Sequence, residues 1–106
     1  MAIIKVQGYE VSSDPGIQNF SSYKGQIDVK DIAPDQNLAY VPENPWWRSD
    51  IAHRFARLLF VEMRPEGALL RYGDQEMLVE YGKSKQIDEV GLSYAYGELW
   101  VEVIKD

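Results

Sequence analysis

The sequence predicts a single α+β domain spanning residues 1–106, with one central amphipathic helix packed on a mostly antiparallel sheet of about five to seven strands. Three observations predict this class. Segments at both ends of the chain alternate between apolar and polar residues, which is typical of half-buried strands. A middle segment places its apolar residues at helical spacing. The length suits one domain with a core that needs no disulfide, and the chain has no cysteine.

The N-terminal part of the chain shows the alternation expected of strands. We expect three strands there, at residues 2–11, 26–32 and 38–41. Proline, glycine and aspartate between them mark turns. The segment 17–25 has only isolated apolar residues, so we expect a loop.

A helix is expected from residue 44 to residue 63. Asn44 or Ser49 suits its N-terminal cap, and Pro65 followed by glycine ends it. At about 100° per residue, most apolar side chains fall on one half of the helical wheel. Asp50, His53, Arg54 and Arg57 fall on the other half.

Phe60 and Val61 lie on the polar side of this helix, so the alternative is an extended chain after about Leu59. We take the helix as the prediction.

The C-terminal part predicts two consecutive hairpins with glycine in their turns. They are formed by residues 68–72 with 76–81 and by residues 92–96 with 99–104. The segment 82–91 between them is polar, and we expect a loop or a single helical turn there.

The distribution of charge bears on the kind of partner. The net charge is −6, yet residues 46–71 carry five arginines against Asp50, Glu62 and Glu66, which gives +2. An acidic protein with one cationic segment is a poor binder of nucleic acid, because phosphate repulsion opposes approach. The chain also has no signal sequence and no apolar run that could span a membrane, so we expect a cytoplasmic protein.

The sequence shows no catalytic or metal-binding motif. It lacks a phosphate loop, a dinucleotide fingerprint and a nucleophile elbow. His53, with Asp50 three residues earlier, is the one candidate general base, and a surface histidine is the favoured reading. We therefore predict no catalytic residue, no metal site and no cofactor.

The segment with adjacent tryptophans and several arginines is the predicted partner-binding site. Tryptophan and arginine concentrate binding energy at protein interfaces. Trp46 and Trp47 cannot both face one core from a straight helix, so one of them is expected to be exposed. The predicted site residues are Trp46, Trp47, Arg48, His53, Arg54 and Arg57.

These observations favour a small non-enzymatic protein-binding module of an inhibitor, immunity or regulatory type. It would act by stoichiometric occupation of a partner with an acidic surface. Two alternatives remain open. One is a structural subunit of a homo-oligomeric or virion-type assembly that associates through sheet edges. The other is a module that binds carbohydrate or another small ligand on aromatic platforms, given seven tyrosines and three tryptophans.

Overall fold

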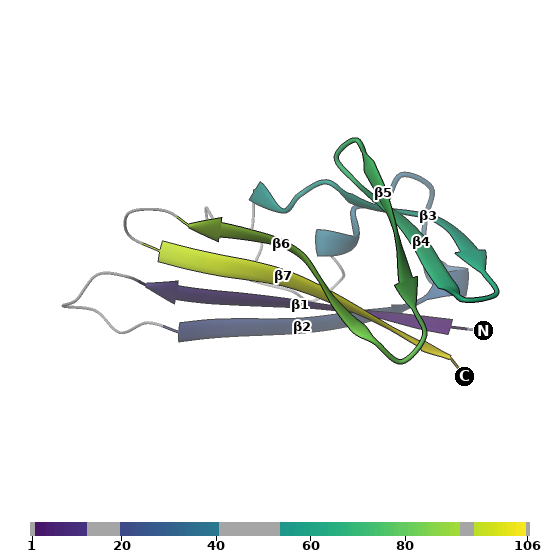
Figure 1. The fold of residues 1–106 in the computed structure, drawn as a ribbon, viewed down its shortest axis with the longest axis horizontal. Helices are drawn as coiled ribbons and strands as arrows, with labels where there is room; N and C mark the ends of the chain where they lie inside the picture. The colour runs from purple at the N-terminus through teal and green to yellow at the C-terminus, as the bar shows by residue number, and fades with distance from the viewer. Residues whose placement is uncertain (1, 13–19, 41–53, 92–94, 106) are drawn as a thin grey trace.

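Strands dominate the computed structural model, which describes residues 2–12, 20–40, 54–91 and 95–105 (Figure 1). Among these residues 72% lie in strands and 8% in helical turns, and no described helix reaches seven residues. The predicted α+β class with a central amphipathic helix is therefore wrong. The described fold is nearly all β.

Seven strands form two antiparallel sheets in the described part of the chain. The four-stranded sheet has the order β2-β1-β7-β6, with β1 at Ala2–Ser12, β2 at Phe20–Asp28, β6 at Ser84–Gly91 and β7 at Ala95–Lys105. The three-stranded sheet has the order β3-β4-β5, with β3 at Leu58–Arg64, β4 at Gly67–Tyr72 and β5 at Gln75–Glu80. Two short 3-10 turns, η1 (Val29–Asp31) and η2 (Leu38–Tyr40), follow β2.

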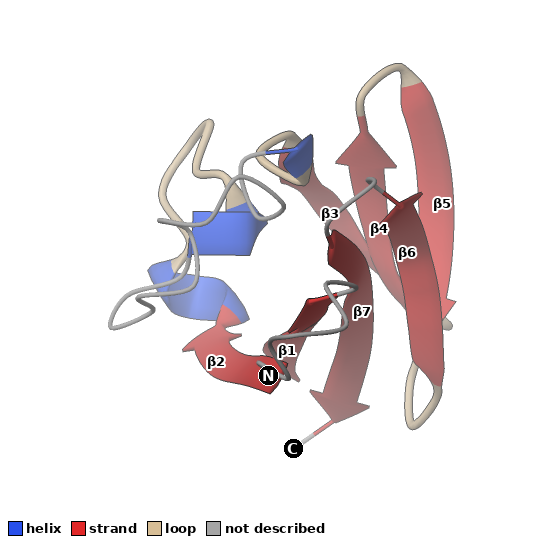
Figure 2. Ribbon diagram, turned by 90° about the vertical axis from the view of Figure 1, so that its left-hand side faces the viewer, coloured by secondary structure: helices blue, strands red, loops and turns tan. Residues whose placement is uncertain are grey.

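The core lies between the two sheets (Figure 2). Alternate residues of each strand point inward, because successive side chains of a strand lie on opposite faces. Each fully buried large aliphatic side chain contributes about 1.5–3 kcal/mol to folding. The inward residues of the best-buried strands are Ile4 and Val6 of β1, Leu99, Val101 and Val103 of β7, and Ala68, Leu70 and Tyr72 of β4.

The middle of the chain differs most from the prediction. Residues 44–53 of the expected helix lie outside the described residues, and β3 begins at Leu58. A β-bulge between Phe60 and Glu62 adds one residue to β3, so that Val61 turns outward while Met63 packs against the core. Core-facing positions 55, 58, 60 and 63 are therefore two or three residues apart. Phe60, which the helical wheel puts on the polar side, therefore packs against the core, and the extended chain from Leu58 is correct where the helix prediction is wrong.

The predictions for the ends of the chain had mixed outcomes. The first strand and the first C-terminal hairpin are confirmed as β1 and as β4 paired with β5. The second hairpin is wrong, since residues 95–105 form one continuous strand. The expected loop at 82–91 is strand β6. The expected loop at 17–25 and the strand at 38–41 are also wrong in their described parts, which belong to β2 and η2.

Gly67 is required by the close approach of β4 and β5. A Cβ atom there would overlap the carbonyl oxygen of Val79 and lie 2.8 Å from Glu80 Cα. We expect Gly67→Ala to lower the free energy of unfolding by about 1–3 kcal/mol, measured by urea denaturation. Gly91→Ala is the control, because its Cβ would meet Tyr96 Cδ2 at an ordinary 3.9 Å. Equal midpoints for both variants would contradict this account.

Candidate functional site

The structure describes only part of the predicted site. Trp46, Trp47, Arg48 and His53 lie outside the described residues, so their grouping stays a prediction. Arg54 and Arg57 are described and exposed, in the turn that leads into β3.

The exposed side chain of Arg57 contacts a residue of the same chain, Tyr72. Its guanidinium carbon lies 4.8 Å from the ring centroid of Tyr72, a cation–π contact. Its carbonyl oxygen accepts a hydrogen bond from the Gly73 amide at 3.3 Å. Interaction with Tyr72, followed by the charges of Asp88 and Asp74, raises the pKa of Arg57 above its usual range. Arg57 thus holds the β4–β5 turn, which makes it less available to a partner than the sequence suggests.

Tyr72 joins the two sheets through its hydroxyl group. The hydroxyl donates to Asp88 Oδ2 on β6 at 2.7 Å and lies 3.3 Å from the carbonyl oxygen of Arg54. Burial, with the hydrogen bond to Asp88 next in size, raises the pKa of Tyr72 from 10.0 to about 12. The Tyr72 hydroxyl therefore supplies a hydrogen-bond donor to the half-buried carboxylate of Asp88. This hydrogen bond connects the three-stranded sheet to β6.

Tyr72→Phe should lower the free energy of unfolding by about 1–3 kcal/mol at pH 7, because Asp88 loses its donor. The raised pKa means that the folded state holds the phenolic proton more tightly than the unfolded state does. This contribution is fully present below about pH 10 and is lost as pH rises through about 12. Urea unfolding between pH 7 and 11.5 should therefore show a shallower alkaline loss in the variant than in the wild type.

The control for this measurement is Tyr81→Phe, which keeps its ring beside the Lys105 ammonium group at 5.5 Å. If Tyr72→Phe matches the wild type in its free energy of unfolding at pH 7 and in the decrease of that free energy at alkaline pH, the Tyr72–Asp88 hydrogen bond does not stabilise the contact between the sheets.

A second cluster lies on the outer side of the four-stranded sheet. We call it the aromatic–carboxylate face, and it comprises Tyr9, Glu89, Tyr96, Glu98 and Trp100. Along β7 its members alternate with buried Leu99 and Val101 and therefore point away from the core. The register sets Tyr9 of β1 and Glu89 of β6 on either side of Glu98.

Hydrogen bonds fix the side chains of this face. The Tyr96 hydroxyl lies 2.6 Å from Glu89 Oε2 and 2.9 Å from Glu98 Oε2. The Trp100 indole Nε1–H donates to Glu98 Oε1 at 2.7 Å. Hydrogen bonds to Glu89 and then Glu98 raise the pKa of Tyr96 above its usual range. Tyr96 nevertheless remains 37% exposed, so the ring is both held in place and accessible.

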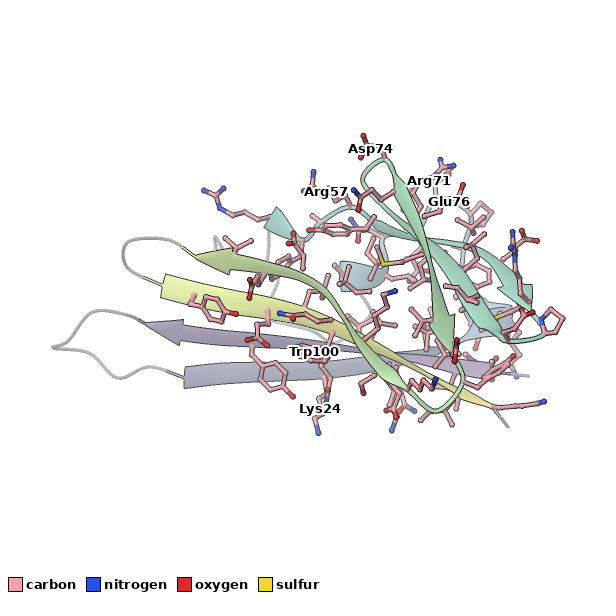
Figure 3. All side chains as sticks on the ribbon, in the orientation of Figure 1. Lys24, Arg57, Arg71, Asp74, Glu76 and Trp100 are labelled. Carbon is pink, nitrogen blue, oxygen red and sulfur yellow. The ribbon has the colours of Figure 1, made fainter. Side chains whose placement is uncertain are left out.

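The charge on this side of the sheet is unevenly placed. Lys5 lies opposite Glu102, and Lys24 lies on β2, opposite Gln7. In Figure 3 Lys24 and Trp100 lie over the four-stranded sheet, while Arg57, Arg71, Asp74 and Glu76 gather near the β4–β5 turn. Glu89 and Glu98 make the aromatic end of the face acidic.

The pattern of the last strand contains a signal for this face. The hairpin turn expected at Gly97-Glu98 separates Tyr96 from Trp100 and hides that signal. In the structure Gly97 pairs with both β1 and β6, so the chain continues straight. Read without a turn, residues 96–104 alternate regularly and put Tyr96, Glu98 and Trp100 on one face.

An open groove of about 280 Å³ lies between β5 and the start of β6. Across it, Lys83 Nζ lies 2.8 Å from Glu80 Oε2, and this ion pair lowers the pKa of Glu80. The groove is lined by Leu78, Val79, Glu80, Lys83, Ser84 and Lys85. No group of three or more histidine, cysteine, aspartate or glutamate side chains suited to a metal ion occurs among the described residues.

Comparisons of the chain with protein-family models, with curated proteins and with solved structures found no match. Within the described ranges, no helix has the length and apolar character needed to cross a membrane.

Proposed function

We propose that this protein is a small non-enzymatic module that acts by stoichiometric binding of another protein, and that the aromatic–carboxylate face takes a basic segment of that partner. The observation that carries the proposal is the accessible Tyr96 ring, hydrogen-bonded to two carboxylates on the outer side of the sheet. An inhibitor or regulatory protein would act in this way, and the cytoplasm remains the expected compartment.

Pre-organisation supports binding at this face. Glu98 receives a hydrogen bond from Trp100, and the single Tyr96 hydroxyl proton lies between Glu89 and Glu98, so these side chains hold their positions before a partner arrives. Side chains that are already ordered lose less conformational entropy on binding. Tyrosine and tryptophan also bury a large area with few rotatable bonds, and they are enriched among residues that dominate interface energies.

Charge favours a basic partner over an acidic one. A guanidinium or ammonium group gains cation–π attraction from an aromatic ring and ionic attraction from a neighbouring carboxylate. Glu89 and Glu98 flank Tyr96, and the whole chain carries −6, which speeds the approach of a cation. The acidic partner expected from the arginine segment is less well supported, because Arg57 is engaged with Tyr72.

The test uses a fluorescent Arg-Gly repeat peptide as the probe and measures anisotropy during titration with the protein. Glu98→Gln and Glu76→Gln each remove one negative charge, but only Glu98 belongs to the aromatic–carboxylate face. We expect Glu98→Gln to weaken binding by about fivefold or more and Glu76→Gln by less than about twofold. Tyr96→Ala should also weaken binding.

Three outcomes would contradict the proposal. Equal weakening by the two glutamate variants would show that the net charge alone attracts the peptide. Absence of peptide binding at low salt would show that the aromatic–carboxylate face does not bind a basic segment. A saturable change in tryptophan fluorescence with a neutral glycan, together with no response to the peptide, would assign the face to carbohydrate instead.

A further inference from the structure

A row of four residues crosses the outer side of the four-stranded sheet from edge to edge. Each member pairs in register with the next: Gln86 of β6 with Trp100, Trp100 of β7 with Gln7, and Gln7 of β1 with Lys24 of β2. Directly opposite residues of antiparallel strands point to the same face of a sheet. Trp100 points outward, so all four do, and Lys24 and Trp100 lie over this sheet in Figure 3. We call these four residues the cross-strand row.

Lys24 brings a positive charge to the far end of this row. It is exposed, and it forms no ion pair with any other residue that the structure describes. Its nearest neighbours on this face are neutral, since Gln7 lies opposite it and Gln26 lies two positions along β2. The charge of Lys24 is therefore not neutralised within the described part of the chain.

Lys24 and the acidic end of the aromatic–carboxylate face are far enough apart to act separately. Glu98 and Lys24 differ by two strands and by two positions along the strand. This offset corresponds to about 12 Å between their Cα atoms. Charges at the surface are screened over about 8 Å at physiological ionic strength. A group bound at Lys24 thus interacts with that lysine more strongly than with Glu98 or with the net charge of the chain.

The middle of the cross-strand row suits a polypeptide backbone. The Trp100 indole ring is held by its hydrogen bond to Glu98, and it lies between the glutamines of β6 and β1. A glutamine amide offers both a donor and an acceptor, as the peptide group requires. Gln7 accepts a hydrogen bond from Tyr9 through Oε1, which leaves its amide NH2 group as the donor.

We infer that the partner segment carries charges of both signs: a basic side chain at Tyr96, between Glu89 and Glu98, and an acidic side chain at Lys24. The chain between them would cross Trp100. This inference rests on the proposed function, from which it takes the basic end of the segment. In an extended peptide, residues four positions apart lie on the same side and about 13 Å from each other. The expected motif is therefore an arginine or lysine four positions from a glutamate or aspartate.

The acidic end serves selectivity more than affinity. An exposed ion pair strengthens binding only modestly, by about threefold. A segment with a second basic residue at this position would instead place like charges together, and Lys24 would repel it. The face should therefore prefer a segment of mixed charge over a purely basic one.

The test titrates the full chain with short peptides of seven residues whose ends are acetylated and amidated. Binding is measured by NMR at the Trp100 indole N–H signal. The first peptide, Ser-Arg-Thr-Ser-Thr-Glu-Ser, has its charges four positions apart, and the second has glutamine in place of glutamate. The third, Ser-Thr-Arg-Glu-Ser-Thr-Ser, has the composition of the first with adjacent charges, which point to opposite sides of an extended chain.

Lys24→Gln and Lys85→Gln form the matched pair of variants. Both remove one exposed positive charge from the four-stranded sheet. Lys85 pairs with buried Val101 and lines the groove, so it lies on the other face. We expect the wild type and Lys85→Gln to bind the first peptide about threefold more tightly than the second or third. Lys24→Gln should bind the first and second equally.

A preference for the first peptide that survives Lys24→Gln would overturn this inference. So would equal binding of the first and third peptides, or equal binding of the first and second by the wild type. The second peptide, which has arginine alone, tests the proposed function, because Glu98→Gln must weaken its binding. If Glu98→Gln does so and no preference depends on Lys24, this inference fails alone. If no peptide binds at about 10 mM, or Glu98→Gln has no effect, both fail.

Discussion

Pairing of β7 on both of its edges is the constraint on which the rest of the structure depends. β7 hydrogen-bonds to β1 along Ala2–Ser12 and to β6 along Ser84–Gly91, so it is the inner strand that both neighbours share. A strand fixed on both sides cannot slip by one residue without exchanging its two faces. Its buried positions therefore fill the core, while the positions between them hold Tyr96, Glu98 and Trp100 outside.

The sequence was sufficient where structure depends on near neighbours. Alternation predicted β1, and Gly73-Asp74 between two apolar segments predicted the β4–β5 hairpin. The sequence alone did not predict the elements whose structure depends on contacts between residues that are far apart in the chain. The bulge at Val61 interrupts the two-residue alternation of β3, so the alternation of Leu59, Val61 and Met63 does not describe which side chains face the core. Gly97 resembles a turn residue, and only pairing on both edges keeps β7 straight there.

The candidate sites differ in how well they could be predicted, for the same reason. Arg54 and Arg57 were identified from composition, but the stacking of Arg57 on Tyr72 joins residues from separate elements. The aromatic–carboxylate face needs β1, β6 and β7 side by side, and no local pattern gives that order. The two sheets also divide the surface chemically. One outer face is acidic and aromatic, and the other carries exposed ion pairs of opposite charge.

Adjacent residues of β6 serve opposite sides of the protein. Asp88 accepts a hydrogen bond from Tyr72 beneath the sheet, and Glu89 accepts one from Tyr96 above it. These two carboxylates belong to consecutive residues, whose side chains lie on opposite faces of the strand. A displacement of β6 at this point would therefore disturb the hydrogen bond of Tyr72 and the hydrogen bond of Tyr96 together.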